Sequence, residues 1–160
     1  MTTAAAQQLN LEFTMARERF ALDAALIQEI TEVPVVQRVP KAPAVVAGLA
    51  DIRGRVVTLI DLEHVFGVDQ RSEGQPVALI LAPPDAHLGL LVHGQPQVVR
   101  LDLSTAEPAG GLIESTLLAS DKLYNIVSPR RVLAYCEKQI LDVFRIVSGD
   151  GQSTPSGRHA

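Results

Sequence analysis

The chain has 160 residues, with 14 Lys plus Arg against 18 Asp plus Glu, and a formal net charge of −4 with His neutral. Its 47% hydrophobic and 20% charged residues are enough to fill and solubilise one domain core, which excludes disorder for the bulk of the chain. The single cysteine, Cys136, cannot form an intrachain disulfide, so we expect a reducing, cytoplasmic compartment.

Composition also argues against two kinds of partner. The only adjacent basic pair is Arg130–Arg131 and aromatic residues are 4% of the chain, so we expect no nucleic-acid binding. The longest nearly apolar stretch, residues 42–50, is about half the length that crosses a bilayer, so we expect no direct membrane insertion.

Short apolar runs, separated by Gly and Pro, succeed one another through most of the chain. Such runs are typical of an all-β barrel or sandwich with many short strands. Residues 55–61 and 76–82 are apolar at nearly every position, which predicts strands covered on both faces, as where two small barrels pack together. The expected strands are residues 11–15, 20–22, 33–39, 56–60, 77–81, 88–92 and 98–101.

Helical signals are fewer. We expect a short helix running into a strand at residues 24–32 and another short helix at 43–52. The clearest helix begins at Ser128, a good N-cap, with Pro129 at its first position. Its predicted apolar stripe, ended by Gly149, consists of Leu133, Cys136, Ile140, Val143, Phe144 and Val147. This helix either covers an open barrel face, which we favour, or docks a partner protein.

The ends of the chain differ from its middle. Residues 1–8 are small and polar, and residues 148–160 are rich in Ser, Gly and Pro. We therefore expect one folded domain over residues 9–147 between two disordered tails.

Catalytic patterns are missing from the sequence. No G-x-S-x-G motif occurs, and the four histidines do not pair at zinc-ligand spacing. Cys136 falls on the apolar stripe of the last helix, where a buried thiol is a poor nucleophile. We expect no catalytic residue, no metal and no cofactor, and hence a protein that is not an enzyme.

One segment has residues that are hard to explain as solvent-facing filler: IQEI at 27–30, RVP at 38–40 and GLADIRGRVVTLIDL at 48–62. This segment resembles the CheW family of chemotaxis coupling proteins, whose pattern reads as an E-I pair, a V-P step and then R-G-x-V-x-x-x-x-D-L. The block PVALILAPPDAHLGLLVHGQPQVVRL at 76–101 extends the resemblance, which covers about residues 9–135. It implies two small five-stranded SH3-like β-barrels packed together, with short helices and a C-terminal helix.

The residues of the R-G corner also make physical sense alone. Gly54, directly before an apolar strand, fits a turn that needs positive φ, and Asp61 is placed to cap a following helical turn. Arg53 on such a corner can reach outward to a carboxylate of a partner. The alternative for Arg53 is an internal ion pair with Asp51, Glu29 or Asp61.

The resemblance further implies a non-catalytic adaptor of a bacterial chemosensory array, cytoplasmic and recruited to membrane-attached receptors. Its partners would be the regulatory domain of a CheA-type histidine kinase, the cytoplasmic hairpin tip of a chemoreceptor, and other CheW-like domains as ring partners. The receptor hairpin would enter the groove between the barrels. The implied receptor-facing residues are Ile27, Glu29, Val39, Arg53 and Val92, and the implied kinase-facing residues are Gly48, Gly54 and Gly94.

Two departures from the family pattern leave other functions open. Asp51 stands where the family usually has Asn, and His93 stands where it usually has Asp. The chain could serve a non-motility chemosensory pathway, such as twitching, biofilm formation or development. A small-molecule-binding barrel or enzyme is the alternative from a different class, and it requires a well-formed pocket with convergent polar groups.

Overall fold

The computed structural model describes residues 7–33, 35–68 and 72–140. Most of these residues form strands. One set of strands is β1 (Gln7–Met15), β2 (Glu18–Asp23), β8 (Gln97–Asp102), β9 (Glu107–Pro108), β10 (Ile113–Ala119) and β11 (Lys122–Val127). The other set is β3 (Ile27–Glu32), β4 (Val46–Ile52), β5 (Arg55–Asp61), β6 (Pro76–Leu81) and β7 (Leu88–His93). Helical segments are η1 (Ala24–Leu26), α1 (Leu62–Val65), η2 (Leu103–Thr105) and residues 129–140.

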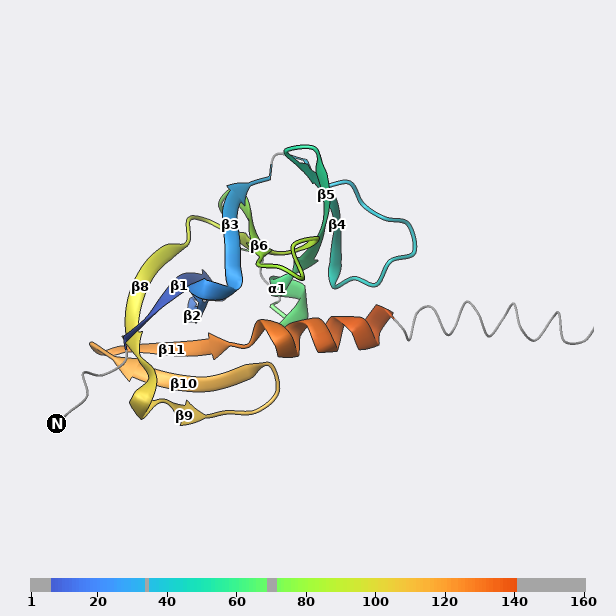
Figure 1. Ribbon diagram of the computed structural model, residues 1–160. Helices are drawn as coiled ribbons and strands as arrows, with labels where there is room; N and C mark the ends of the chain where they lie inside the picture. Colours follow the sequence, from blue (N-terminus) through green and yellow to red (C-terminus); the bar gives the residue numbers. More distant parts are fainter. Residues whose placement is uncertain (1–6, 34, 69–71, 141–160) are drawn as a thin grey trace, which may run out of the picture.

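The strands make two curled sheets that lie against each other (Figure 1). Barrel A has the strand order β8-β1-β2-β11-β10-β9, and barrel B has the order β3-β6-β7-β5-β4. Each sheet contains one parallel pair, β2 with β11 in barrel A and β5 with β7 in barrel B. The expected two-barrel fold is confirmed, and barrel A has a sixth strand because the two-residue β9 extends its edge.

Three hairpins share one turn geometry. Met15 pairs with Glu18, Ile52 with Arg55, and Ala119 with Lys122, which leaves two residues in each turn. All six turn residues have positive φ, the signature of the type I′ turn whose twist matches that of the flanking strands. Gly54, at φ 83°, has the conformation that its position predicted.

Three apolar clusters hold the barrels together. Those inside the barrels centre on Leu59 and Ile80 in barrel B and on Leu117 and Ile126 in barrel A. The third, larger cluster lies between the barrels and takes Phe13 and Leu22 from one sheet and further residues from the other. In β6, Ala78 and Ile80 face the barrel B interior, whereas Val77, Leu79 and Leu81 join the cluster between the barrels. The unbroken apolar run of this strand is therefore explained by burial of both of its faces.

Six of the expected strands lie within observed ones: residues 11–15, 20–22, 56–60, 77–81, 88–92 and 98–101. The expected strand at 33–39 is wrong, because among its described residues only Gln37 bridges to another strand, at Leu49. Strand β1 begins at Gln7, so residues 7 and 8 of the predicted N-terminal tail pair with β8 instead. The predicted C-terminal tail lies outside the described residues.

Of the two short helices expected in the first third of the chain, the one that runs into a strand at 24–32 is confirmed and the one at 43–52 is wrong. At 24–32 only η1 is helical, where Asp23 Oδ1 accepts a hydrogen bond from Ala25 N, and β3 follows at once because it pairs with β6. At 43–52 the chain turns with a bond from Val46 N to Pro43 O and continues as β4. At 43–52, pairing of β4 with β5 overrides a weak local helical pattern.

The last helix begins as expected. Ser128 Oγ accepts a hydrogen bond from Arg131 N at 3.2 Å, and residues 129–140 are helical. Its buried face carries Val132, which the predicted stripe omitted, and Cys136, both in the cluster between the barrels. Ile140 is 41% exposed, and Val143, Phe144, Val147 and Gly149 lie outside the described residues. In Figure 1 the helix runs below α1, whose residues Leu62 and Val65 share its core cluster.

Candidate functional site: the cleft between the barrels

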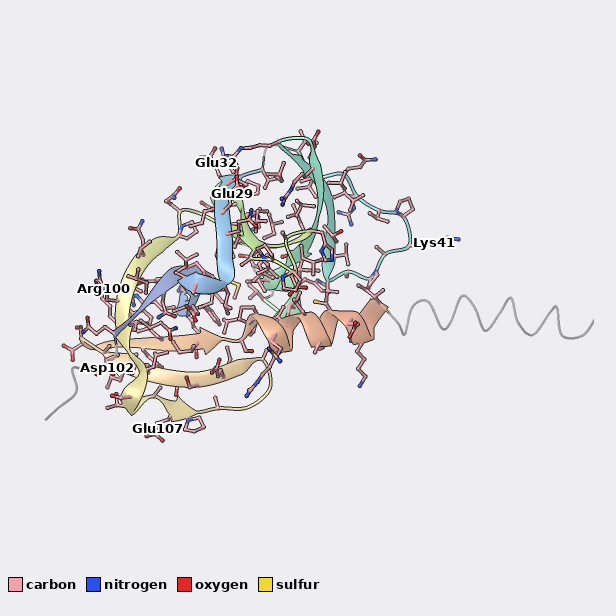
Figure 2. The ribbon with its side chains drawn as sticks, viewed as in Figure 1. Glu29, Glu32, Lys41, Arg100, Asp102 and Glu107 are labelled. Carbon is pink, nitrogen blue, oxygen red and sulfur yellow. The ribbon has the colours of Figure 1, made fainter. Side chains whose placement is uncertain are left out.

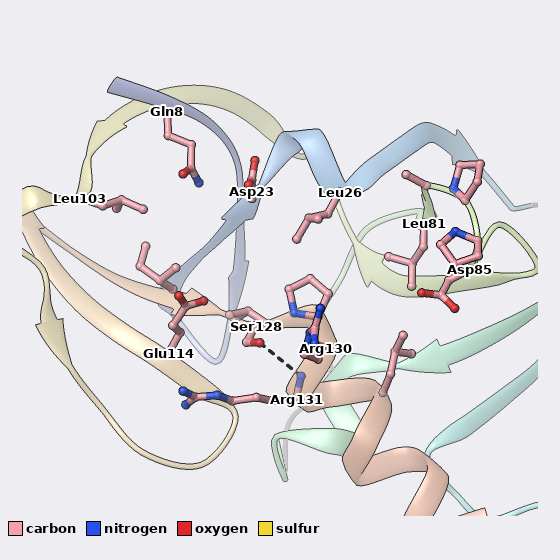
Figure 3. Close-up of a pocket in the computed structure, with 17 residues that line it drawn as sticks. Gln8, Asp23, Leu26, Leu81, Asp85, Leu103, Glu114, Ser128, Arg130 and Arg131 are labelled. Carbon is pink, nitrogen blue, oxygen red and sulfur yellow. Dashed lines mark hydrogen bonds between the residues drawn. The ribbon is translucent and has the colours of Figure 1, made fainter. Parts of the chain in front are cut away.

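A cleft of about 770 Å³ opens where the two barrels and the last helix meet. It is lined by the end of β2, η1, the end of β6 with the loop that follows it, the end of β11 and the first helical turn after Ser128 (Figure 3). Leu26, Leu81, Leu103 and Leu133 supply much of its apolar lining. Apolar side chains from both barrels and from the helix therefore meet in one lining.

The charged groups of the cleft are on its walls. Arg130 and Arg131 come from the helix start, Asp85 from the loop after β6, and Glu114 from β10. Arg131 Nη1 donates to the carbonyl oxygens of Gly111 at 3.2 Å and Ile113 at 3.5 Å, so its guanidinium is held against the chain before β10. The cleft therefore combines an apolar lining with charges of both signs.

Glu29 and Arg53, two of the predicted receptor-facing residues, are brought together. The Arg53 guanidinium forms an ion pair with the Glu29 carboxylate. Arg53 is in the β4–β5 turn and Glu29 is in β3, so the pair links these two elements. The Arg53 side chain stays 75% exposed and that of Glu29 is 21% exposed, so the pair lies at the surface. Glu29 is labelled on β3 in Figure 2. Neither residue lines the cleft.

Asp51, which stands where the family pattern has Asn, does not pair with the Arg53 guanidinium. Asp51 Oδ1 accepts a hydrogen bond from Gly54 N at 2.8 Å and so closes the β4–β5 turn. Asp61 caps α1 as predicted, accepting from Glu63 N and His64 N. Of the three internal partners considered for Arg53, the structure therefore pairs it with Glu29.

The three apolar residues expected in the receptor groove do not converge. Val92 is fully buried in the cluster between the barrels, so its side chain belongs to the core and cannot contact a partner. Val39 is 38% exposed on the connection between β3 and β4, away from the residues that line the cleft. Ile27 is half-buried and pairs with Leu81, a residue of the cleft lining. Only Ile27 is next to the cleft.

The three predicted kinase-facing glycines have different environments. Gly48 is buried, and a Cβ atom there would lie 2.3 Å from the Gln37 carbonyl oxygen, so packing explains this glycine. Gly54 precedes β5, whereas Gly94 follows β7, and a Cβ atom at either position would meet nothing within 4 Å. Because β5 and β7 are parallel, these two glycines lie at opposite ends of barrel B. They do not form one surface.

Side chains that could bind a metal ion do not cluster in the part of the chain that the structure describes. Within residues 7–33, 35–68 and 72–140, no three His, Cys, Asp or Glu residues come together as a metal site would require. Burial raises the pKa of the Cys136 thiol to about 11, which leaves little thiolate near neutral pH. None of the described helices combines the length and apolar character needed to span a membrane.

Sequence reasoning missed most of the cleft. Leu81 was predicted as the end of an apolar run, Leu26 fell in the segment predicted as a short helix before a strand, and Arg130 was considered only as half of a basic pair too small to bind nucleic acid. The helix-start signal at Ser128–Pro129 placed Arg130 in a first turn, but nothing in the sequence brought that turn beside η1 and β6.

Comparisons with known proteins agree with this fold. The family model for the CheW-like domain matches residues 10–136. Chemotaxis protein CheV3 of Helicobacter pylori is 27% identical over 92 residues, and chemotaxis protein CheW of Klebsiella aerogenes is 29% identical over 100 residues. These matches cover 56% and 62% of this chain, but 30% and 60% of the relatives' own lengths.

A solved structure shows the same architecture. The scaffolding protein TtCheW of Thermoanaerobacter tengcongensis superposes with a TM-score of 0.68 at 22% identity, over 76% of this chain and 89% of that one. At this identity the likeness establishes the two-barrel fold. Since the family model spans most of the described residues, the chain belongs to the CheW-like domain family.

Proposed function

We propose that this protein is a non-catalytic scaffold of a bacterial chemosensory array that couples chemoreceptors to a CheA-type histidine kinase. The observation that carries the proposal is the cleft, whose apolar lining and inter-barrel position suit the amphipathic helical hairpin at a receptor tip. CheW-family membership supports it, as do the two relatives named as chemotaxis proteins. In this proposal the protein is cytoplasmic and reaches the membrane through its receptor.

The kinase is proposed to contact the exposed ends of barrel B. The β4–β5 turn with Gly54 is one such end, and its Glu29–Arg53 ion pair offers a neighbouring charged patch. Contacts there leave the cleft open, so one molecule can hold kinase and receptor together. Movement of the receptor hairpin can favour one kinase arrangement over another only if the contacts among receptor, scaffold and kinase differ between the two kinase arrangements.

Co-sedimentation with a receptor cytoplasmic fragment and with the kinase tests the proposal. Leu26 is 43% exposed, so Leu26→Glu leaves the core intact and places a charge in the apolar lining. We expect loss of receptor binding with kinase binding kept. Leu123→Glu is the matched control, because Leu123 is 57% exposed and lies away from the cleft. Equal receptor binding by the two variants would overturn the proposal.

Arg53→Glu tests the exposed end of barrel B that carries the Glu29–Arg53 ion pair. It replaces the Glu29–Arg53 attraction with a repulsion at an exposed site, so the fold is expected to survive. We expect weaker binding to the kinase, which is proposed to contact this end of barrel B. If binding to both receptor and kinase is unchanged, the patch has no place in the interface.

A further inference from the structure

We infer that Arg130 sets the charge specificity of the cleft, selecting a partner helix that carries an acidic side chain beside its apolar stripe. This inference rests on the proposed function, in which a receptor hairpin occupies the cleft. It adds a specificity-determining residue and the chemistry that this residue selects.

The two adjacent arginines differ in what they bind. The Arg131 guanidinium donates to the backbone carbonyls of Gly111 and Ile113, so its donors are partly used within the protein. Arg130 is exposed and lines the cleft, and within the described part of the chain its side chain makes no hydrogen bond or ion pair. Its guanidinium keeps five donors in a planar fork that suits a carboxylate.

The apolar lining makes that guanidinium selective. Leu26 and Leu81 line the same cleft as Arg130 (Figure 3), as does Leu133, so a helix that covers these leucines removes water from this region. A guanidinium that loses water without gaining a carboxylate is destabilised, whereas one that gains a carboxylate is compensated. Arg130 therefore favours an acidic partner residue and disfavours a basic or apolar one at the same position.

The other charges of the cleft restrict where that acidic residue can lie. Asp23 Oδ1 accepts a hydrogen bond from Ala25 N at the start of η1. Asp85 and Glu114 place carboxyl groups on other walls. An acidic partner residue placed toward either of them meets a like charge, so positions on the side of the helix start, where Arg130 has its donors free, are favourable. The charge pattern thus fixes how the bound helix is oriented as well as which helix binds.

The experiment uses the full chain and a fluorescently labelled cytoplasmic hairpin fragment of a chemoreceptor encoded in the same genome. Binding is followed by anisotropy for wild type, Arg130→Glu and the control Lys122→Glu. Lys122 is exposed at the start of β11 outside the cleft, and both substitutions change the net charge equally. Arg130→Glu puts an acidic residue in the first helical turn, which is compatible with the helix dipole, so folding is preserved. Each acidic residue of the hairpin tip is also changed to Lys in turn.

We expect Arg130→Glu to weaken binding about tenfold, which is within the range for close charge pairs at interfaces. Lys122→Glu is expected to change affinity less than about twofold, as for a charge outside the contact. One hairpin Lys variant is expected to bind Arg130→Glu more tightly than the unmodified hairpin does.

Equal affinities for Arg130→Glu and Lys122→Glu overturn the inference, as does a hairpin series in which no Lys variant restores binding. The Leu26→Glu variant separates this failure from failure of the proposed function. If Leu26→Glu abolishes binding but Arg130→Glu does not weaken it, only the charge inference is wrong. If Leu26→Glu also binds normally, the cleft is not the receptor site.

Discussion

The two barrels have the same strand architecture but different interiors. Barrel B comes from the middle of the chain, and its interior cluster is apolar throughout, with Val57 and Leu59 fully buried. Barrel A joins the two ends of the described chain, and a partly exposed polar network borders its interior cluster, with the Glu12 and Arg19 side chains 20% and 40% exposed. Tyr124 OH donates to Glu12 Oε1 at 3.2 Å, and Arg19 Nε donates to Glu12 Oε2 at 3.1 Å.

This difference follows from how each barrel closes. The residues that meet in the barrel A network are up to 112 positions apart in the sequence, on hairpins β1–β2 and β10–β11. Hydrogen bonds are directional, so such a network specifies the register between two distant hairpins as well as their contact. The interior cluster of barrel B consists of apolar side chains. The two barrels should therefore respond differently to the same kinds of substitution.

The largest effect is expected in barrel B. Leu59→Ala removes a fully buried side chain from its interior and leaves a cavity, which typically costs about 3 kcal/mol of unfolding free energy. Urea denaturation followed by circular dichroism measures this change. Leu118→Ala is the control, since Leu118 is 69% exposed and is expected to change stability little. Similar losses for the two variants would contradict the packing assigned to barrel B.

The core between the barrels is tested through Cys136. Burial raises the pKa of this thiol to about 11 from an ordinary 9.0, so its thiolate fraction at pH 8 is about a hundredfold lower. We expect iodoacetamide to alkylate the native protein at least about a hundredfold more slowly than the urea-unfolded chain. Comparable rates would show that the last helix does not stay packed across both barrels.

A smaller effect is expected in barrel A. Glu12→Ala removes the acceptor of both Tyr124 and Arg19 and leaves the buried hydroxyl without that bond, which costs about 2 kcal/mol. Tyr124→Phe removes only the hydroxyl and is expected to cost about 1 kcal/mol. In the double variant the two losses should not add, because both remove the same hydrogen bond. Additive losses would mean that the network is not coupled.

The smallest effect is a pH dependence confined to alkaline solution. Burial, and then the charge of Glu12, raises the pKa of Tyr124 above its ordinary 10.0. The folded state thus holds the phenolic proton more tightly than the unfolded state, so this contribution to stability is complete below pH 10 and falls as the pH rises further. The free energy of unfolding is measured by urea denaturation at pH 9 and again above pH 10. Its decrease between the two conditions should be smaller for Tyr124→Phe than for the wild type. An identical loss in both proteins would assign the pH dependence to other groups.

The sequence predicted the local features well. The R-G turn, the Asp61 cap and the Ser128–Pro129 helix start depend on residues within a few positions of one another, and all three are observed. Apolar runs located six strands but not β3, β4, β9, β10 or β11, which contain fewer apolar residues in a row. Local propensity could not decide these segments because pairing with a neighbouring strand determines their conformation.

The candidate site was less predictable. The family resemblance placed Glu29 and Arg53 among the partner-facing residues, and the structure shows them paired at the surface. It also placed Val92 there, although a valine in an apolar strand reads the same whether its face is covered or exposed, and the structure buries it completely. Most of the cleft could not be assembled from the sequence, because Leu26, Leu81 and Arg130 come from three separated segments.

The sequence by itself determined the two-barrel fold class, the CheW-like resemblance, the turn and cap chemistry and the start of the last helix. These properties follow from short-range patterns and from apolar content, which tertiary contacts do not alter. Only the tertiary structure decided which faces are buried, which carboxylate pairs with Arg53, and which residues surround the cleft. Those outcomes depend on how distant segments pack, and that packing is set by the closure of both barrels around a shared core rather than by any one segment.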